Sequence, residues 1–432
     1  MKLNIGVIVC VAIAFVSCNR PVRYDLIIEN ASIVDFDADS VIHNKTILIS
    51  SDTIAGIVDA GEPIRTRKVV DADGRIVVPG NIDSHTVVRN FLHSNGRAFQ
   101  HHPKNVTTFY RNIISQNFLP FGITTLVDME TDSSWIPQIN MLKSHPRFSD
   151  IIAVKQVNEK NFNTLLNNTD SVVSSEKVNY FYISDFDVAK YDLNSVDLSP
   201  NKVLFVRPTA NSVFSCNCKL IEGISSIVRG VMYASNQDAM LKRQIQNVYS
   251  LAQDIPDELY ILEAFNFLVE NNPELLDSIV NKLATQNVSV STGLYTLKEF
   301  AEKPSVRYDG LVLTKELKQR LNYDFSHLLN FVGKLYKAGV TLRVGNNSNY
   351  NGIAFSEEQK ILADAGISVF DVFKISSLNS AKALKIDKKV GKIVKGYIAD
   401  LLVYEASPFD NTSSFGQVRR IIKNGKVVKL KD

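Results

Sequence analysis

The sequence predicts an α/β fold built from parallel strand–helix units, together with a smaller region made of strands alone. Residues 24–78 contain short runs of alternating apolar and polar residues with no helical period, and residues 391–428 have the same texture. Between these ends, strand-like and helix-like segments alternate, which is typical of parallel βα units. With 432 residues, of which 45% are hydrophobic, the chain can bury a large core.

The charge balance limits the classes of partner that we expect. The chain carries 48 Lys and Arg against 45 Asp and Glu, a formal net charge of +3. Binding to nucleic acid calls for a concentrated basic face, and nothing in this balance suggests one. We therefore expect no nucleic-acid partner.

The first eighteen residues are predicted to be a targeting segment and not part of the fold. Lys2 gives a short positive region, residues 5–16 form an apolar stretch too short to span a bilayer comfortably, and Ser17-Cys18 closes it. This pattern resembles a bacterial lipoprotein signal peptide, although such signals usually have a smaller aliphatic residue where Phe15 stands. The resemblance implies a cell-envelope protein outside the cytosol, anchored to a membrane by lipid on Cys18. An uncleaved anchor helix is the alternative.

The segment around residue 85 combines a strand end with half of a metal-binding pattern. Residues 69–80 alternate and then break at Pro79-Gly80, as a strand ending in a turn should. His85 follows, and a histidine two residues later would point the same way and share a divalent ion with it. Val87 occupies that position. Because an aliphatic side chain has no lone pair, this strand offers a metal at most one nitrogen.

Further motifs follow in order toward the C-terminus. They are residues 337–348, 378–384, 390–403 and 422–428. Together with Pro-Gly-x-Ile-Asp-x-His at residues 79–85, they resemble the amidohydrolase superfamily, in particular its imidazolonepropionase/prolidase-like branch. The resemblance implies a (β/α)8 TIM-like barrel and metal-dependent hydrolysis of carbon–nitrogen bonds.

The resemblance also implies how the chain is divided. In this superfamily the two chain ends pair into one small domain beside the barrel. We therefore expect a signal peptide at residues 1–18, a composite β-sandwich from residues 24–80 and 390–432, and the barrel at residues 81–389.

Seven segments are expected to form barrel strands two to eight. They are residues 122–128, 151–154, 180–183, 203–206, 260–264, 288–291 and 341–344. The stretch 208–256 is longer than one crossover between strands needs, so we expect an insertion over the barrel mouth there.

Catalysis in such a barrel comes from the C-terminal ends of the strands, and this chain departs from the superfamily at most of them. Val87 is one departure. After strand five, where the superfamily usually has a ligand histidine, this chain has Arg207. At strand six, where the superfamily commonly has Glu-His, it has Glu263-Ala264. The usual strand-eight aspartate is replaced by Asn347, whose amide cannot act as a base. His85 alone is a weak metal ligand, and no catalytic residue is assigned.

The same strand ends are expected to line a ligand pocket. Its expected residues are His85, Val87, Asp128, Arg207, Glu263, Asn346 and Asn347. The guanidinium of Arg207 and the two amides suit a small anionic ligand such as a carboxylate or phosphate. We expect no cofactor, with a divalent metal such as zinc only if the site is an unusual metal centre.

Three functions stay open at this point. The first is a catalytically degenerate barrel at the membrane surface that binds a small-molecule ligand or a protein partner. The second is an active hydrolase of carbon–nitrogen bonds that uses an unusual metal site. The third is a structural lipoprotein subunit. The fold alone cannot choose among them, because function belongs to the site.

Overall fold

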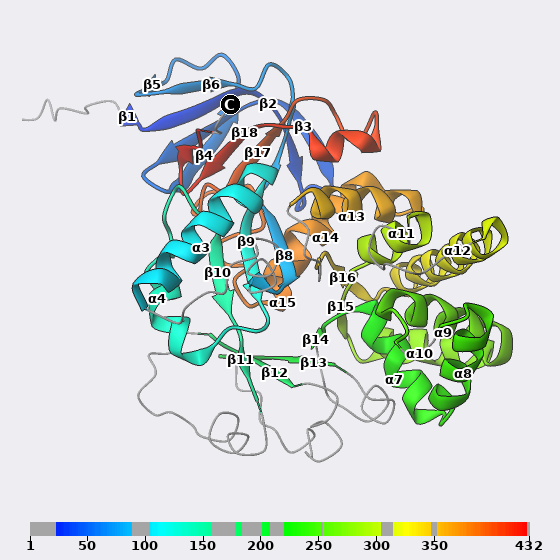
Figure 1. Ribbon diagram of the computed structural model, residues 1–432. Helices are drawn as coiled ribbons and strands as arrows, with labels where there is room; N and C mark the ends of the chain where they lie inside the picture. Colours follow the sequence, from blue (N-terminus) through cyan, green and yellow to red (C-terminus); the bar gives the residue numbers. More distant parts are fainter. Residues whose placement is uncertain are drawn as a thin grey trace, which may run out of the picture.

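The structure is a computed structural model in which a β-sheet domain lies beside a parallel barrel, with helices around the barrel (Figure 1). It describes residues 23–88, 103–157, 178–183, 201–207, 220–251, 254–303, 314–346 and 352–429. The expected signal peptide and Cys18 lie outside these residues. Among the helices of the described residues, none combines the length and the apolar composition needed to cross a lipid bilayer.

Strands from both ends of the chain share one eight-stranded sheet. Its members are β2 (Leu26–Asp35), β3 (Ser40–Ser50), β4 (Thr53–Asp59), β6 (Val69–Asp71), β7 (Ile76–Pro79), β17 (Leu401–Tyr404), β18 (Val418–Lys423) and β19 (Lys426–Val427). The two ends meet where β17 pairs antiparallel with β7, and β7 in turn pairs parallel with β2. A separate two-stranded pair joins β1 (Arg23–Tyr24) to β5 (Arg65–Thr66). The domain boundaries given above stay a prediction.

The alternation along the strands of this sheet decides what each face contacts. In β17, Leu401 and Val403 pack into a core formed within the sheet domain. Leu402 and Tyr404 instead join the large core that includes the barrel helices. Successive side chains of a strand point to opposite faces, so one short apolar strand serves both cores.

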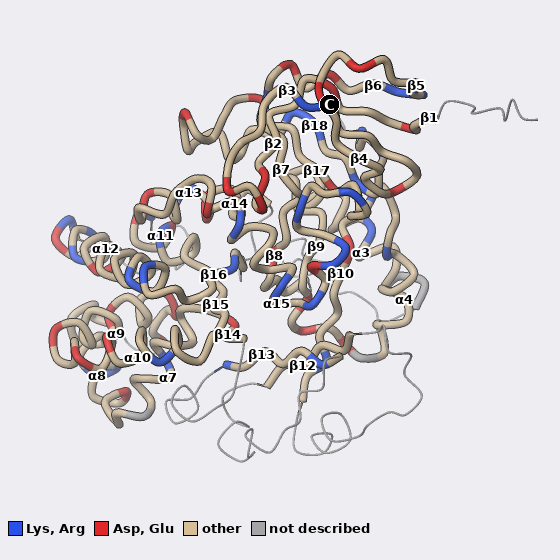
Figure 2. The backbone as a smooth tube through the Cα atoms, turned by 180° about the vertical axis from the view of Figure 1, so that it is seen from behind, with Lys and Arg blue, Asp and Glu red and all other residues tan. Residues whose placement is uncertain are grey.

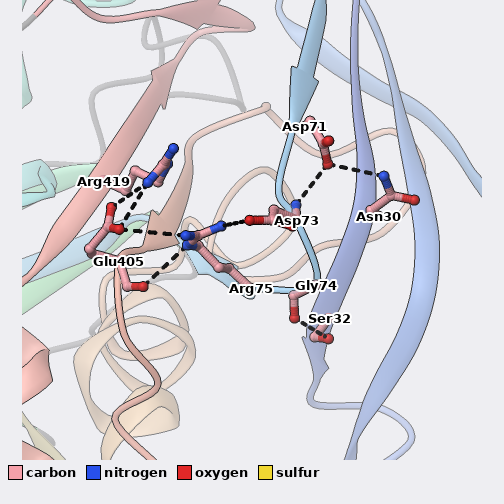
Figure 3. Close-up of polar contacts among 8 residues, drawn as sticks. All are labelled: Asn30, Ser32, Asp71, Asp73, Gly74, Arg75, Glu405 and Arg419. Atoms are coloured by element: carbon pink, nitrogen blue, oxygen red, sulfur yellow. Dashed lines mark hydrogen bonds and ion pairs between the residues drawn. The ribbon is translucent and has the colours of Figure 1, made fainter.

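Exposed ion pairs join the two chain ends at the edge of the sheet domain (Figure 3). Arg75, in the turn before β7, contacts Asp73 at 2.6 Å and Glu405 at 3.5 Å. Glu405, just after β17, also pairs with Arg419 of β18 at 2.8 Å. Exposed pairs of this kind contribute little to stability, so the backbone pairing and the apolar cores hold the two ends together.

The barrel strands are parallel and run in sequence order. They are β8 (Asn81–Thr86), β9 (Ile123–Asp128), β10 (Asp150–Ala153) continued by β11 (Lys155–Gln156), β12 (Asn179–Ile183), β13 (Lys202–Val206), β14 (Leu220–Ile221), β15 (Ser289–Ser291) and β16 (Thr341–Arg343). The ring closes because the Ser84 amide of β8 donates to the Val344 carbonyl, directly after β16, at 2.9 Å. The expected α/β barrel is therefore confirmed.

The helices lie outside the barrel strands, with α3 and α4 on one side and α7–α12 on the other (Figure 1). The helices are α3 (Pro103–Asn117), α4 (Ile136–Asn140), α7 (Ile224–Ala234), α8 (Asp238–Val248), α9 (Asp257–Asn271), α10 (Pro273–Thr285), α11 (Tyr295–Glu302), α12 (Lys315–Lys337), α13 (Ile353–Asp364), α14 (Val369–Ser376) and α15 (Leu378–Ala383). Charged residues of both signs are spread over the helices and the sheet domain (Figure 2).

The expected position of strand six is wrong. Residues 260–264 lie in α9, and strand six is β14, inside the stretch that we expected to be an insertion. That stretch also contains α7 and α8. The apolar run in α9 continues with buried Phe265 and Leu268, so it is a buried helix segment, which a short apolar run does not distinguish from a strand.

Glu263 is consequently not at the barrel mouth but in the contact between α9 and α12. It pairs with Arg320 of α12 at 2.5 Å and accepts a hydrogen bond from the Tyr249 hydroxyl. Asp324, one turn along α12 from Arg320, is fully buried, and neither of its carboxyl oxygens has a hydrogen-bond partner among the described residues. Burial, together with the charge of Glu263, raises the pKa of Asp324 to about 7.

A buried ion cluster joins the sheet domain to the barrel. Lys423 of β18 has no exposed side-chain surface, and its Nζ lies 2.8 Å from both Asp400 and Asp150. Asp150 begins the barrel strand β10, whereas Asp400 directly precedes β17. Burial alone would lower the pKa of Lys423, but the two carboxylates outweigh it and raise that pKa. Lys423 is therefore a buried cation whose charge is balanced across the junction.

We expect Lys423→Met to lower the free energy of unfolding by about 3 kcal/mol, because it leaves buried carboxylates without their cation. The measurement is urea denaturation followed by circular dichroism. Lys426→Met is the matched control, since Lys426 is exposed on the neighbouring strand β19. Equal midpoints for Lys423→Met and the wild type would show that the cluster does not stabilise the junction.

Asp324 predicts a pH dependence of stability. Its pKa of about 7 in the folded protein lies above its usual 3.8, so the protonated form stabilises the fold. That contribution is complete below about pH 4 and is lost as the pH rises through 7. We expect Asp324→Asn, which stays neutral, to be more stable than the wild type at pH 8 by roughly 1–3 kcal/mol and nearly equal to it at about pH 3.5.

Thermal denaturation at the two pH values measures this difference. Asp277→Asn serves as the control, because Asp277 is 59% exposed in its pair with Lys334 and should show little change at either pH. An Asp324→Asn variant that is no more stable than the wild type at pH 8 would contradict the prediction.

Candidate functional site

Three polar side chains meet at the C-terminal ends of the barrel strands. His85 lies near the end of β8, Arg207 directly follows β13 and Glu222 directly follows β14. The Nε atom of Arg207 donates to Oε1 of Glu222 at 2.5 Å, and Nδ1 of His85 lies 2.8 Å from the Glu222 carbonyl oxygen. Because carboxyl ends of parallel strands meet at one mouth, residues 137 apart in sequence are neighbours here.

The partner of His85 decides its protonation. A backbone carbonyl can only accept, so Nδ1 carries the hydrogen and Nε2 is the acceptor nitrogen of the neutral ring. Burial lowers the pKa of His85; Glu222 opposes this, while Arg207 and the buried Arg343 lower the pKa further. The ring is therefore neutral at physiological pH.

Glu222 is the buried anion of this site. Its side chain is 3% exposed, whereas that of Arg207 is 34% exposed. Burial would raise the pKa of Glu222, but the charge of Arg207 and hydrogen bonds from Tyr182 and Ser226 outweigh burial and lower that pKa. Glu222 thus stays ionised beneath a guanidinium that reaches the surface of the mouth.

Asp83 ties the first barrel strand to the last. Its Oδ1 accepts from the amides of His85 and Asn346, both at 3.1 Å. Burial raises the pKa of Asp83 to about 7. Asn346, which we expected at the pocket, is 4% exposed and lies just after β16. Its position at the mouth is fixed through its backbone.

Asp128, at the end of β9, accepts hydrogen bonds from several donors. The Tyr110 hydroxyl donates to Oδ2 at 2.7 Å and that of Thr131 at 3.0 Å, while the Val88 amide donates to Oδ1 at 3.1 Å. Burial raises the pKa of Asp128, and these donors oppose the rise. The carboxylate thus holds β8, β9 and α3 together at the mouth.

Val87 is 5% exposed and belongs to an apolar cluster inside the barrel. That cluster includes Ile82, Val127, Met129, Ile152, Val154, Tyr182, Val203, Phe205 and Leu220. Where a second ligand histidine would stand, the chain therefore has an apolar contact. Asn347, also expected at the pocket, lies outside the described residues.

The described residues of the mouth do not fit the dication that the resemblance implies. No group of three or more His, Cys, Asp or Glu side chains within the described part of the chain could hold a metal ion. The Glu222 carboxylate is already paired with Arg207, whose permanent charge would repel a dication.

The sequence analysis missed Glu222. Strand six is only Leu220–Ile221, too short for any alternating pattern, and the longer apolar run of α9 took its place in the alignment. Glu222-Gly223 at the start of α7 is a strand-to-helix turn, but one such turn is a weak indication of a site.

Comparison with known proteins supports the fold. Residues 327–428 match the model of the amidohydrolase family. No curated protein matches significantly. A solved molinate hydrolase is similar with a TM-score of 0.63 and 13% identity, covering 94% of each chain.

Two further solved structures agree. A prolidase solved with N-methylphosphonate-L-proline has a TM-score of 0.58 and 14% identity, over 94% of this chain and all of that one. The ochratoxinase of A. niger has a TM-score of 0.56 and 13% identity, over 93% and 95% of the two chains. The barrel and its attached sheet thus have the fold of amidohydrolases, and the C-terminal part of the chain carries the match to the amidohydrolase family.

Proposed function

We propose that this protein is an envelope lipoprotein whose amidohydrolase-type barrel no longer carries out metal-dependent hydrolysis and binds a small anionic ligand at its mouth. The observation that carries the proposal is the Arg207–Glu222 ion pair at the ends of strands five and six. The pair holds a partly exposed guanidinium, with its N–H donors, at the strand ends where such a barrel carries its reactive residues.

The chemistry of the described residues supports the proposed loss of hydrolysis. Metal-assisted hydrolysis needs a dication that acidifies a bound water and a carboxylate that takes the proton. Val87 offers no lone pair, and the lowered pKa of Glu222 makes it a poor base. The only imidazole that the described residues place at the mouth is His85, and one nitrogen cannot hold zinc against water.

The preference for an anion follows from the charges. Two guanidinium groups, Arg207 and Arg343, lower the pKa of His85, and Glu222 is the one carboxylate near them whose pKa is lowered. Asp83 titrates near 7 and offers only part of a charge. Arg343 thus adds a positive charge near His85 that Glu222, already paired with Arg207, does not balance, and a guanidinium suits a carboxylate or phosphate.

Calorimetry on the mature domain tests the proposal with acetate, succinate, phosphate, zinc and manganese as probes. We expect an anion to bind and the double variant Arg207→Met/Glu222→Gln to bind it at least tenfold more weakly, because the variant removes the exposed cation without leaving a buried charge. Arg419→Met is the control, since Arg419 is 36% exposed in its pair with the exposed Glu405 of the sheet domain, away from the mouth.

A tightly bound metal with metal-dependent turnover of amide, lactam or dipeptide substrates by the unmodified protein would overturn the proposal in favour of an active hydrolase. Absence of any anion binding would contradict it as well, and would favour a purely structural role or a protein partner.

Membrane anchoring through Cys18 is the second part of the proposal and rests on the N-terminal pattern of residues 1–18. We expect Cys18→Ala to lose lipid labelling and to stay uncleaved or become soluble, because the acylated thiol is gone. Cys10→Ala is the control and should change neither property, since Cys10 lies inside the segment that is removed. Unchanged lipid labelling and membrane fractionation of Cys18→Ala would rule the anchor out.

A further inference from the structure

The barrel interior contains a guanidinium that the sequence analysis did not single out. Arg343, the last residue of β16, is fully buried. Its Nε donates to Oγ of Ser289 at 2.8 Å, and its Nη2 donates to the carbonyl of Ile221, also at 2.8 Å. Its guanidinium carbon lies 5.6 Å from the centre of the Phe205 ring. All of these partners belong to strands β13, β14 and β15.

These contacts place Arg343 one layer below the mouth. Phe205 is two residues before Arg207, and alternate residues of a strand point to the same side. Ile221 directly precedes Glu222. Arg343 also acts electrostatically on His85. The guanidinium therefore lies beneath the group formed by His85, Arg207 and Glu222.

The charge of Arg343 is not balanced by the described residues. Its Nη1 is buried and has no hydrogen-bond partner among them. The partners of its other nitrogens are a hydroxyl and carbonyls, which are neutral. Burial lowers the pKa of Arg343 to about 9, so the group is still a cation at neutral pH. A buried cation without a counter-ion is unfavourable, and an anion that reached Nη1 would relieve this.

We propose that Arg343 anchors the ligand: its Nη1 donates to a carboxylate group that enters through the mouth past Arg207. This inference rests on the proposed function and names the ligand class and its deepest contact. A singly charged carboxylate matches the single uncompensated cation, whereas a phosphate would bring a second negative charge close to the ionised Glu222.

The experiment compares acetate, succinate and phosphate by calorimetry and by thermal shift on the mature wild type, Arg343→Met and Arg343→Lys. We expect a carboxylate to bind the wild type, and its affinity for Arg343→Met to be at least tenfold lower. Arg343→Lys keeps the charge but loses the planar fork, so it should bind with intermediate affinity. Without ligand, Arg343→Met should melt no lower than the wild type, because it removes an unbalanced buried charge.

Arg419→Met is the matched control and should bind like the wild type, since its guanidinium is paired with the exposed Glu405 of the sheet domain. If Arg343→Met fails to fold, Arg343→Lys decides, because undiminished carboxylate affinity in that variant overturns the anchor. Anion binding that is lost in Arg207→Met/Glu222→Gln but unchanged in Arg343→Met also overturns it, and leaves the proposed function standing. Preferred binding of phosphate overturns the ligand class, and a wild type that binds no anion overturns both proposals.

Discussion

Closure of the barrel between its first and last strands is the constraint on which the mouth depends. The Ser84 amide and hydroxyl both reach the Val344 carbonyl, at 2.9 and 2.7 Å. Gly345 lies so close to β15 and β8 that a Cβ there would be 1.8 Å from Ser291 Oγ and 2.8 Å from the His85 Cβ. Only glycine fits this approach. Asp83 adds a further link between the first strand and the end of the last one, because its carboxylate accepts a hydrogen bond from the Asn346 amide.

Once the ring is closed, its strand ends must tolerate several buried polar groups in a small space. A bound dication would tie the ends of several strands together through its ligands. In this chain, hydrogen bonds and an ion pair connect them: Arg207 to Glu222, His85 to the Glu222 carbonyl, and Asp128 to the Val88 amide. The described part of the mouth is therefore held together by the chain's own side chains.

Much of the fold could be predicted from the sequence, because the barrel is built from successive strand–helix units and most of its strands have a local apolar run of their own. Strands two to five, seven and eight lie where their apolar runs predict. Strand six fails for a physical reason: Leu220–Ile221 is held by its neighbours and has too few residues to show a period, whereas the apolar residues of α9 are buried on every side of a helix. The error moved Glu263 into the expected pocket and left Glu222 out.

The site was less predictable than the fold, since its chemistry depends on distances that the sequence does not contain. Val87 could be placed from its flanking motif, and it packs in the apolar cluster of the barrel. Arg207 had only the weaker alignment around strand five to place it, and it lies at the mouth. That Arg207 is paired with a carboxylate could not be predicted, because the partner comes from the misplaced strand. In the sequence, nothing distinguishes Arg343 from any other arginine in a strand. Only the structure shows that it is fully buried.

The two guanidinium groups then differ in what they can do for a ligand. The charge of Arg207 is balanced by Glu222 and lies partly in water, where screening weakens its attraction. That of Arg343 lies in a medium of low polarity, where a single charge acts strongly over a short distance. Arg207 is suited to draw an anion to the mouth, and Arg343 to hold it. This difference in role follows from the difference in burial alone, because both side chains carry the same guanidinium group.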